Sequence, residues 1–166
     1  RYSFGSFWAL KSPVPDPTNP DRVILAAMEN GFYDLYLVDL DSQKVIERVT
    51  TDPQDDDFPA WLPDSSGIVY STEVGLSSQN YANRNLYIWK REDKVAQRLT
   101  HGIHAERAPA VSRDGRRVLF TSDEDGSWDL YELDRVSNTV ERKTKVIGAI
   151  FSPSFMGNDG ILYGSF

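Results

Sequence analysis

Cysteine is absent from this chain of 166 residues, and histidine occurs only twice. The lack of cysteine excludes disulfide bonds, thiol catalysis and cysteine-ligated zinc sites. The longest apolar run, from Val23 to Met28, is far shorter than the roughly 20 residues that a membrane-spanning helix needs, so we expect no transmembrane segment. No stretch keeps an apolar period of 3.6 residues, so helix should be almost absent.

The charged residues are mostly acidic: 25 Asp and Glu stand against 18 Lys and Arg, which gives a net charge of −7. Affinity for nucleic acid comes mostly from Lys and Arg side chains that neutralise phosphates, so we expect no nucleic-acid partner. The rest of the composition, 40% hydrophobic and 26% charged, is that of an ordinary soluble protein of one domain.

What the chain does contain is an internal repeat. A phrase of seven residues with proline at its second position occurs three times, and each copy continues into a turn and an apolar triplet. The copies are Phe58–Asp64, Ala108–Asp114 and Ser152–Asn158, and their triplets are Ile68–Tyr70, Val118–Phe120 and Ile161–Tyr163. Successive copies are 50 and 44 residues apart, a spacing typical of propellers and solenoids.

Differences in length between the repeats can be placed at particular residues. The second unit carries six additional residues within Glu73–Arg84. We predict a further copy of the phrase around Trp8, with eight additional residues, much of Lys11–Pro20, lengthening the turn that follows it.

Each unit reads as four short strands, because β-branched and aromatic residues dominate and Gly, Pro, Asn and Asp fall between them. The triplets show no apolar alternation, so both faces of each sheet must be buried. An all-β β-propeller of four-stranded antiparallel blades buries both faces, whereas a β-sandwich needs no sequence repetition. We predict about three and a half blades, approximately residues 1–50, 51–100, 101–144 and 145–166, the last one incomplete.

Propellers have about four to eight blades, so we expect this chain to be a segment of a longer propeller or to receive its missing strands from elsewhere. We also expect the aromatic residue of the phrase, Trp61 or Phe155, to pack between blades. Asp34, Asn85 and Asp129, which precede the Leu-Tyr pairs, are expected to be structural hydrogen-bonding residues.

Residues 58–72 and 112–131 resemble the TolB-like (WD-like) β-propeller repeat, in which a Pro-x-aromatic-Ser-Pro-Asp-Gly turn precedes an apolar strand and an Asp-Leu-Tyr strand. The resemblance covers essentially the whole chain and implies a β-propeller fold. It implies no single function, because the same repeat occurs in periplasmic scaffolds, in peptidase gating domains and in some carbohydrate-active enzymes. The chain departs from the pattern in the long turn after Trp8 and at residues 157–160.

Blade geometry places two kinds of loop on one face: those joining the second and third strands, and those leading from the fourth strand to the next blade. Nearly all distinctive polar residues fall near these loops, so we predict a binding face there. Its candidate residues are Asp52, Asp55, Asp56, Asp57, Tyr81, His101, His104, Glu106, Arg107, Asp123 and Asp125. Tyr81 is a candidate stacking platform for a sugar or a peptide.

We predict no cofactor, and retain calcium as the alternative. Asp123 and Asp125, followed by Gly126, begin like a calcium loop but lack its later ligands, so turn formation is the favoured interpretation. His101 and His104 have the residue types for a transition-metal site or for acid–base catalysis, but no third ligand is specified, and exposed loop positions are the favoured interpretation.

No Gly-x-Ser-x-Gly elbow occurs, and we predict no catalytic residue. The resemblance favours a non-catalytic propeller scaffold that binds a protein partner, or the remainder of its propeller, in a periplasmic or extracellular assembly. The alternative is the propeller domain of an enzyme, either a prolyl-oligopeptidase-like gating domain or a metal-dependent carbohydrate-active propeller. A structural subunit of an extracellular assembly is a third hypothesis.

Overall fold

The computed structural model describes residues 7–76, 82–157 and 160–166, and this part of the chain is built of antiparallel β-strands. The first sheet contains β1 (Leu10–Asp16), β2 (Asn19–Glu29), β3 (Phe32–Asp39) and β4 (Lys44–Arg48); the second contains β5 (Asp56–Trp61), β6 (Gly67–Leu76), β7 (Ala82–Lys90) and β8 (Val95–Arg98); the third contains β9 (Glu106–Val111), β10 (Arg117–Ser122), β11 (Asp129–Asp134) and β12 (Thr139–Arg142); and the fourth contains β13 (Ile150–Met156) and β14 (Gly160–Ser165). No helix in the described residues is long and apolar enough to cross a membrane.

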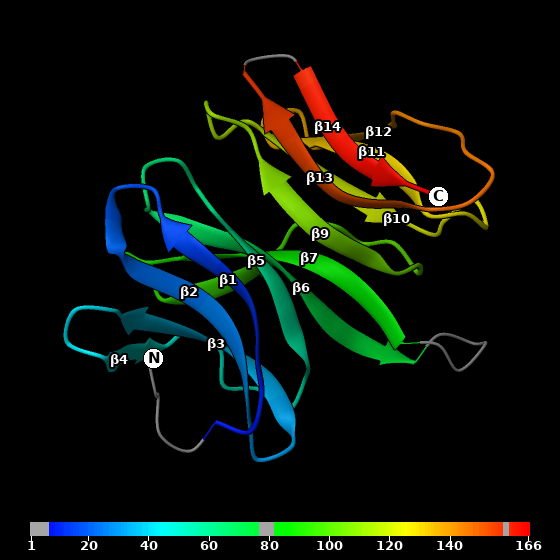
Figure 1. Cartoon of the computed structure of the whole chain (residues 1–166). Helices are drawn as coiled ribbons and strands as arrows, with labels where there is room; N and C mark the ends of the chain where they lie inside the picture. The colour runs from blue at the N-terminus through cyan, green and yellow to red at the C-terminus, as the bar shows by residue number, and fades with distance from the viewer. Residues whose placement is uncertain (1–6, 77–81, 158–159) are drawn as a thin grey trace.

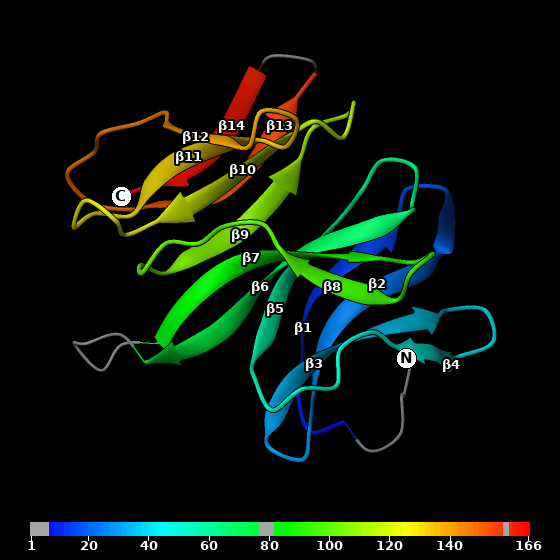
Figure 2. The ribbon, with the colours of Figure 1, turned by 180° about the vertical axis from the view of Figure 1, so that it is seen from behind.

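The four sheets follow one another in chain order along an arc, with the first sheet at one end and the β13–β14 sheet at the other (Figures 1 and 2). Within each sheet the strands lie side by side in sequence order. The first strand of each sheet contacts the first strand of the next, so β1, β5, β9 and β13 form the inner side of the arc. These are the blades of a β-propeller, and the all-β prediction is confirmed.

The first strand of every blade carries the same backbone irregularity. Ser12, Phe58, Ala108 and Ser152 each precede a proline and have φ between 49° and 52°, in the left-handed region. A β-bulge interrupts the pairing with the second strand at each of these positions. The phrase is therefore a strand with a built-in bulge, and it occurs four times.

The prediction for the first copy was wrong. The bulge lies at Ser12 and not near Trp8, and Lys11–Pro20, predicted to be a long turn, contains most of β1 and the start of β2. Pro15 occupies the place of the aromatic residue of the phrase and pairs with Val23, whereas Trp61 pairs with Ile68, so the turn is longer by one residue and not by eight. Trp8, 86% exposed, is outside the strand.

Since a left-handed φ costs an L-residue roughly 1–2 kcal/mol, glycine should be tolerated at the bulge better than elsewhere in the strand. We expect Ala108→Gly to leave the free energy of unfolding unchanged or to raise it by up to about 1 kcal/mol. The matched change Ala110→Gly, at a position without a positive φ, should lower it by about 0.5–1 kcal/mol. Urea denaturation measures both values, and equal losses would show that the bulge is not strained.

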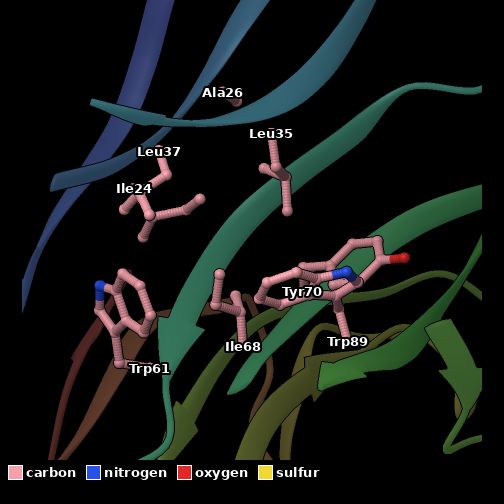
Figure 3. Packing of buried hydrophobic residues seen from close by; sticks show 8 residues of the cluster. All are labelled: Ile24, Ala26, Leu35, Leu37, Trp61, Ile68, Tyr70 and Trp89. Atoms are coloured by element: carbon pink, nitrogen blue, oxygen red, sulfur yellow. The ribbon is translucent and has the colours of Figure 1, made fainter. Parts of the chain in front are cut away.

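Three apolar cores lie between successive blades, and a fourth, around Val23, Leu25 and Ala27, lies on the other face of the first blade. At the first junction, apolar side chains of the first blade face those of the second (Figure 3): Ile24, Ala26, Leu35 and Leu37 on one side, and Trp61, Ile68, Tyr70 and Trp89 on the other. The indole N–H of Trp61 also donates to the carbonyl of Val14 at 3.1 Å. Phe155 packs against the core of the third junction, so the packing role predicted for both aromatic residues is confirmed.

A repeated polar cluster ties the third strand of each four-stranded blade to the end of its fourth strand. In the third blade, Arg142 reaches the Asp129 carboxylate at 2.5 Å and the Thr144 carbonyl at 2.7 Å. The Thr144 hydroxyl donates to Asp129 at 2.8 Å and accepts the N–H of Leu130 at 2.9 Å. Equivalent clusters form around Asp34 in the first blade and Asn85 in the second, so these residues are structural, as predicted.

Candidate functional site

The described loops among those predicted to form a binding face lie together at one end of the blades. Short parallel bridges join Arg84 to Ala105 and Trp128 to Ala149, so the loop entering each blade lies beside the start of the preceding third strand. We call this end of the molecule the loop face, comprising residues 30–31, 49–55, 99–105, 123–128 and 143–149.

Two of the predicted acidic residues hold the second blade against the first. Asp57 lies in β5, not in a loop, and is buried; it pairs with the Lys11 ammonium at 2.8 Å and accepts the Ser12 hydroxyl at 2.7 Å. The Asp55 carboxylate accepts the backbone N–H of Tyr33 at 2.9 Å. Asp52 is exposed, and its side chain accepts the N–H of Gln54 at 3.2 Å, a hydrogen bond typical of a turn.

Glu106 has a similar internal role at the second junction. It opens β9 and is buried, and its carboxylate accepts the Asn85 amide at 3.1 Å, the Leu86 N–H at 3.3 Å and the Thr100 hydroxyl. Burial raises the pKa of Glu106 above its ordinary value, and these three donors offset part of that rise. Glu106 therefore joins two blades and is not a free loop carboxylate.

Arg107, Asp123 and Asp125 also contact the protein itself. The Arg107 guanidinium lies over the Trp128 ring, 4.8 Å from its centroid. Asp123 accepts the N–H of Ala105 at 2.9 Å, and Asp125 pairs with Arg142 at 2.6 Å. The carboxylates predicted as weak calcium ligands thus receive protein donors.

His101 is exposed and His104 is half-buried, both in the loop that enters the third blade. In the described part of the chain, no group of three or more His, Asp or Glu side chains is arranged to hold a metal ion. Tyr81 lies outside the described residues. For all of these residues, contact with a partner stays a prediction.

Asp56 differs from the other acidic residues predicted for the site. It opens β5 and is fully buried, yet neither of its carboxylate oxygens has a hydrogen-bond partner among the described residues. Desolvation raises its pKa to about 7, and the charges of Asp52 and Asp34 add to this rise.

The structure also reveals apolar side chains on the loop face that the sequence search did not consider. Ile103 is 75% exposed and Ile147 is fully exposed, and they lie in equivalent loops, 44 residues apart. Isoleucine beside glycine in a loop is the signal that could have identified them. An open hollow of about 410 Å³ lies on the same face where the first two blades meet, lined in part by Phe32, Asp55 and Glu73.

Comparisons with known proteins identify the architecture. No protein-family profile matches the chain, and no curated protein matches it. Among solved structures, a protein assigned as TolB from Agrobacterium tumefaciens superposes with a TM-score of 0.83 at 21% identity, over 99% of this chain and 57% of its own. TolB from Acinetobacter baumannii gives a TM-score of 0.73 at 20% identity, over 95% of this chain and 40% of its own.

A third similar structure comes from a study of two prolyl endopeptidases, with a TM-score of 0.66 at 14% identity, over 90% of this chain and 24% of that one. At these identities the likeness shows the fold alone. The chain has a TolB-like β-propeller fold, as the sequence resemblance implies, and spans little more than half the length of the first of these proteins.

Proposed function

We propose that this chain is a non-catalytic β-propeller scaffold that binds protein partners in an extracytoplasmic assembly. The TolB-like fold supports the scaffold role, and the sequence resemblance supports the setting. The observation that carries the proposal is the pair of exposed isoleucines, Ile103 and Ile147, at equivalent positions on the loop face.

Exposed aliphatic side chains rimmed by polar groups are typical of protein interfaces. Ile103 lies between His101 and His104 in the sequence, and Ile147 follows Lys145 by two residues, with the half-buried Val146 between them. Burying a whole isoleucine side chain contributes about 1.5–3 kcal/mol. Burial of two such side chains in neighbouring loops would favour binding of a partner at this face.

The test begins with crosslinking and identification of proteins that bind the wild-type chain, followed by affinity measurement with the purified partner. We expect Ile103→Asp combined with Ile147→Asp to weaken binding at least tenfold, since about 1.4 kcal/mol corresponds to a tenfold change. Val136→Asp is the matched control, because Val136 is also 75% exposed but lies in the β11–β12 turn at the opposite end of the blade. Equal affinity of the double variant and the wild type would refute the proposed face.

The β13–β14 sheet supports a second partner, the remainder of the propeller or a chain that replaces it. β2, β6 and β10 each pair with strands on both sides, whereas β14 pairs only with β13 among the described strands. Phe151, Leu162 and Phe166 on this sheet and its end are exposed. Two further strands would give β14 the second neighbour that its counterparts have.

The alternative function, the gating propeller of a prolyl-oligopeptidase-like enzyme, is favoured by the likeness to a structure from the study of two prolyl endopeptidases. It requires a hydrolase domain in the same protein, so a Gly-x-Ser-x-Gly elbow encoded beside this segment would support it. The metal-dependent carbohydrate-active alternative requires a bound metal that is lost when His101 and His104 are both replaced by Ala, which elemental analysis measures.

A further inference from the structure

We infer that Asp56 is a proton-binding site at the junction of the first two blades, and that this junction weakens when the proton leaves. The inference concerns the stability of the junction and does not depend on which protein the loop face binds.

The second junction shows how the fold normally accommodates a carboxylate at this place. Asp56 and Glu106 occupy equivalent positions, each opening the first strand of its blade and pairing with the second strand, opposite Thr72 and Ser122 respectively. Glu106 faces the neutral amide of Asn85 and also accepts the Thr100 hydroxyl and a backbone N–H. Its carboxylate therefore has three donors.

At the first junction the same donors are used elsewhere. Asp34 stands where the second blade has Asn85, so the neighbouring group is a second carboxylate and not an amide donor. The Thr50 hydroxyl, equivalent to that of Thr100, is directed at Asp34 at 3.5 Å, and Arg48 also pairs with Asp34, at 2.6 Å. Aspartate is also one methylene shorter than glutamate, so Asp56 reaches less far toward the preceding blade.

The third junction has no carboxylate at the position of Asp56. Its equivalent position is Ile150, which is apolar and buried, while Asp129 pairs with Arg142. Of the three junctions, the first is therefore the one that buries two carboxylates against a single arginine.

A proton on Asp56 would remove the charge of a buried carboxylate that has no hydrogen-bond partner among the described residues. The Thr72 hydroxyl, opposite Asp56 in the β5–β6 pairing, is also buried without a hydrogen-bond partner in the described part of the chain. A hydroxyl can both donate and accept, so Thr72 can hydrogen-bond with either form of Asp56. Protonation therefore stabilises the junction by removing a buried charge and not by adding a hydrogen bond.

The charged and titratable groups around Asp56 favour the proton overall. Burial is the main cause that raises its pKa to about 7, and Asp52 from the loop before β5 and Asp34 from β3 add to the rise. The hydroxyls of Thr72 and Thr50 lie near enough to lower the pKa in part, although neither forms a hydrogen bond with Asp56. The phenol of Tyr70 on β6 faces the same group, and Arg48 on β4 faces Asp34. Arg48 thus lies on the other carboxylate of this pair, and Lys11 pairs with the neighbouring Asp57.

The direction of the pH effect follows from the ordinary pKa of 3.8 and the folded-state pKa of about 7. Between these values the folded chain holds a proton that the unfolded chain has released, so stability falls as the pH rises and levels off above about pH 7. One proton contributes about a tenfold increase in the unfolding equilibrium constant per pH unit, close to a thousandfold across the window.

Asp56 is connected to the loop face through its neighbours. Asp55 and Asp57 on either side hold the first blade through Tyr33 and Lys11, and Asp55 lines the hollow between the two blades. Ionisation of Asp56 therefore places a buried charge between two contacts that shape this part of the loop face.

Urea denaturation of the wild type and of Asp56→Asn at pH 5 and pH 8 tests the inference. Asp56→Asn should remove most of the loss that the wild type shows between these values, leaving the variant at least tenfold more stable at pH 8. Asp52→Asn is the control, since that carboxylate is exposed, and it should keep the wild-type pH profile. Parallel profiles for Asp56→Asn and the wild type would overturn the inference.

A measurement on the unaltered chain covers the case in which Asp56→Asn does not fold. Carboxyl ¹³C resonances of the wild type, assigned and followed from pH 3 to pH 9, should show Asp56 titrating near pH 7. A midpoint for Asp56 at or below pH 4 would overturn the inference.

Discussion

Phe120→Ala is expected to lower the free energy of unfolding by about 3–5 kcal/mol, the range for deleting a buried phenylalanine ring. Phe120 is 1% exposed and packs in the core between the second and third blades, with its ring stacked on that of Tyr131 at a centroid distance of 5.7 Å. Because Leu62, Val69 and Ile88 from the second blade pack in the same core, the loss should weaken the junction and not only the third blade. Urea denaturation measures the change.

Phe151→Ala is the matched control for this effect. Phe151 lies in β13, is 46% exposed and contacts the ring of Phe166, so its removal leaves no enclosed cavity. We expect a loss below about 1 kcal/mol. If the two phenylalanines gave equal losses, the junction between the second and third blades could not be the core described here.

Arg142→Ala is expected to lower the free energy of unfolding by about 3 kcal/mol, because it leaves the buried Asp129 carboxylate without its cation. Burial alone would raise the pKa of Asp129, but Thr144, Arg142 and the N–H of Val146 together lower it below its ordinary value. This stabilisation is present above about pH 4 and is lost as the pH falls. The difference between wild type and variant should therefore shrink toward pH 2, as urea denaturation over a pH series would show.

Two variants separate this effect from a general sensitivity to losing arginine. Arg116→Ala removes an exposed pair with Asp134 in the same blade and should cost less than about 1 kcal/mol. Adding Asp129→Asn to Arg142→Ala should recover at least half of the loss, because the second blade already carries Asn85 at the equivalent position. A double variant less stable than Arg142→Ala would contradict the buried-charge explanation.

The repeat predicts the fold well because a blade is a local unit whose strands, turns and bulge are encoded within about 44 residues. The triplets lie in the second strands as expected, and the residues before the Leu-Tyr pairs form the predicted hydrogen bonds. The first copy was misplaced because Pro15 and Asp16 occupy the positions of Trp61 and Leu62, so the aromatic landmark is absent while the bulge remains.

The candidate site was less predictable from the sequence because burial is decided by the next blade and not by the residues themselves. Asp56, Asp57 and Glu106 look like loop acids in the sequence, yet each lies at the start of a first strand, where the preceding blade covers it. Ile103 and Ile147 were overlooked for the opposite reason, since an apolar residue is expected inside. In both cases the sequence gives the chemistry of the side chain but not its environment.

The affinity of a purified partner for two variants tests most directly whether the loop face binds through its isoleucines while its acids hold the blades together. Ile103→Asp combined with Ile147→Asp should reduce affinity at least tenfold with little change in the free energy of unfolding. Asp57→Asn should lower the free energy of unfolding, because it weakens the contacts with Lys11 and Ser12, while the folded variant binds with wild-type affinity. Loss of affinity in Asp57→Asn together with unchanged affinity in the isoleucine variant would contradict this assignment of roles.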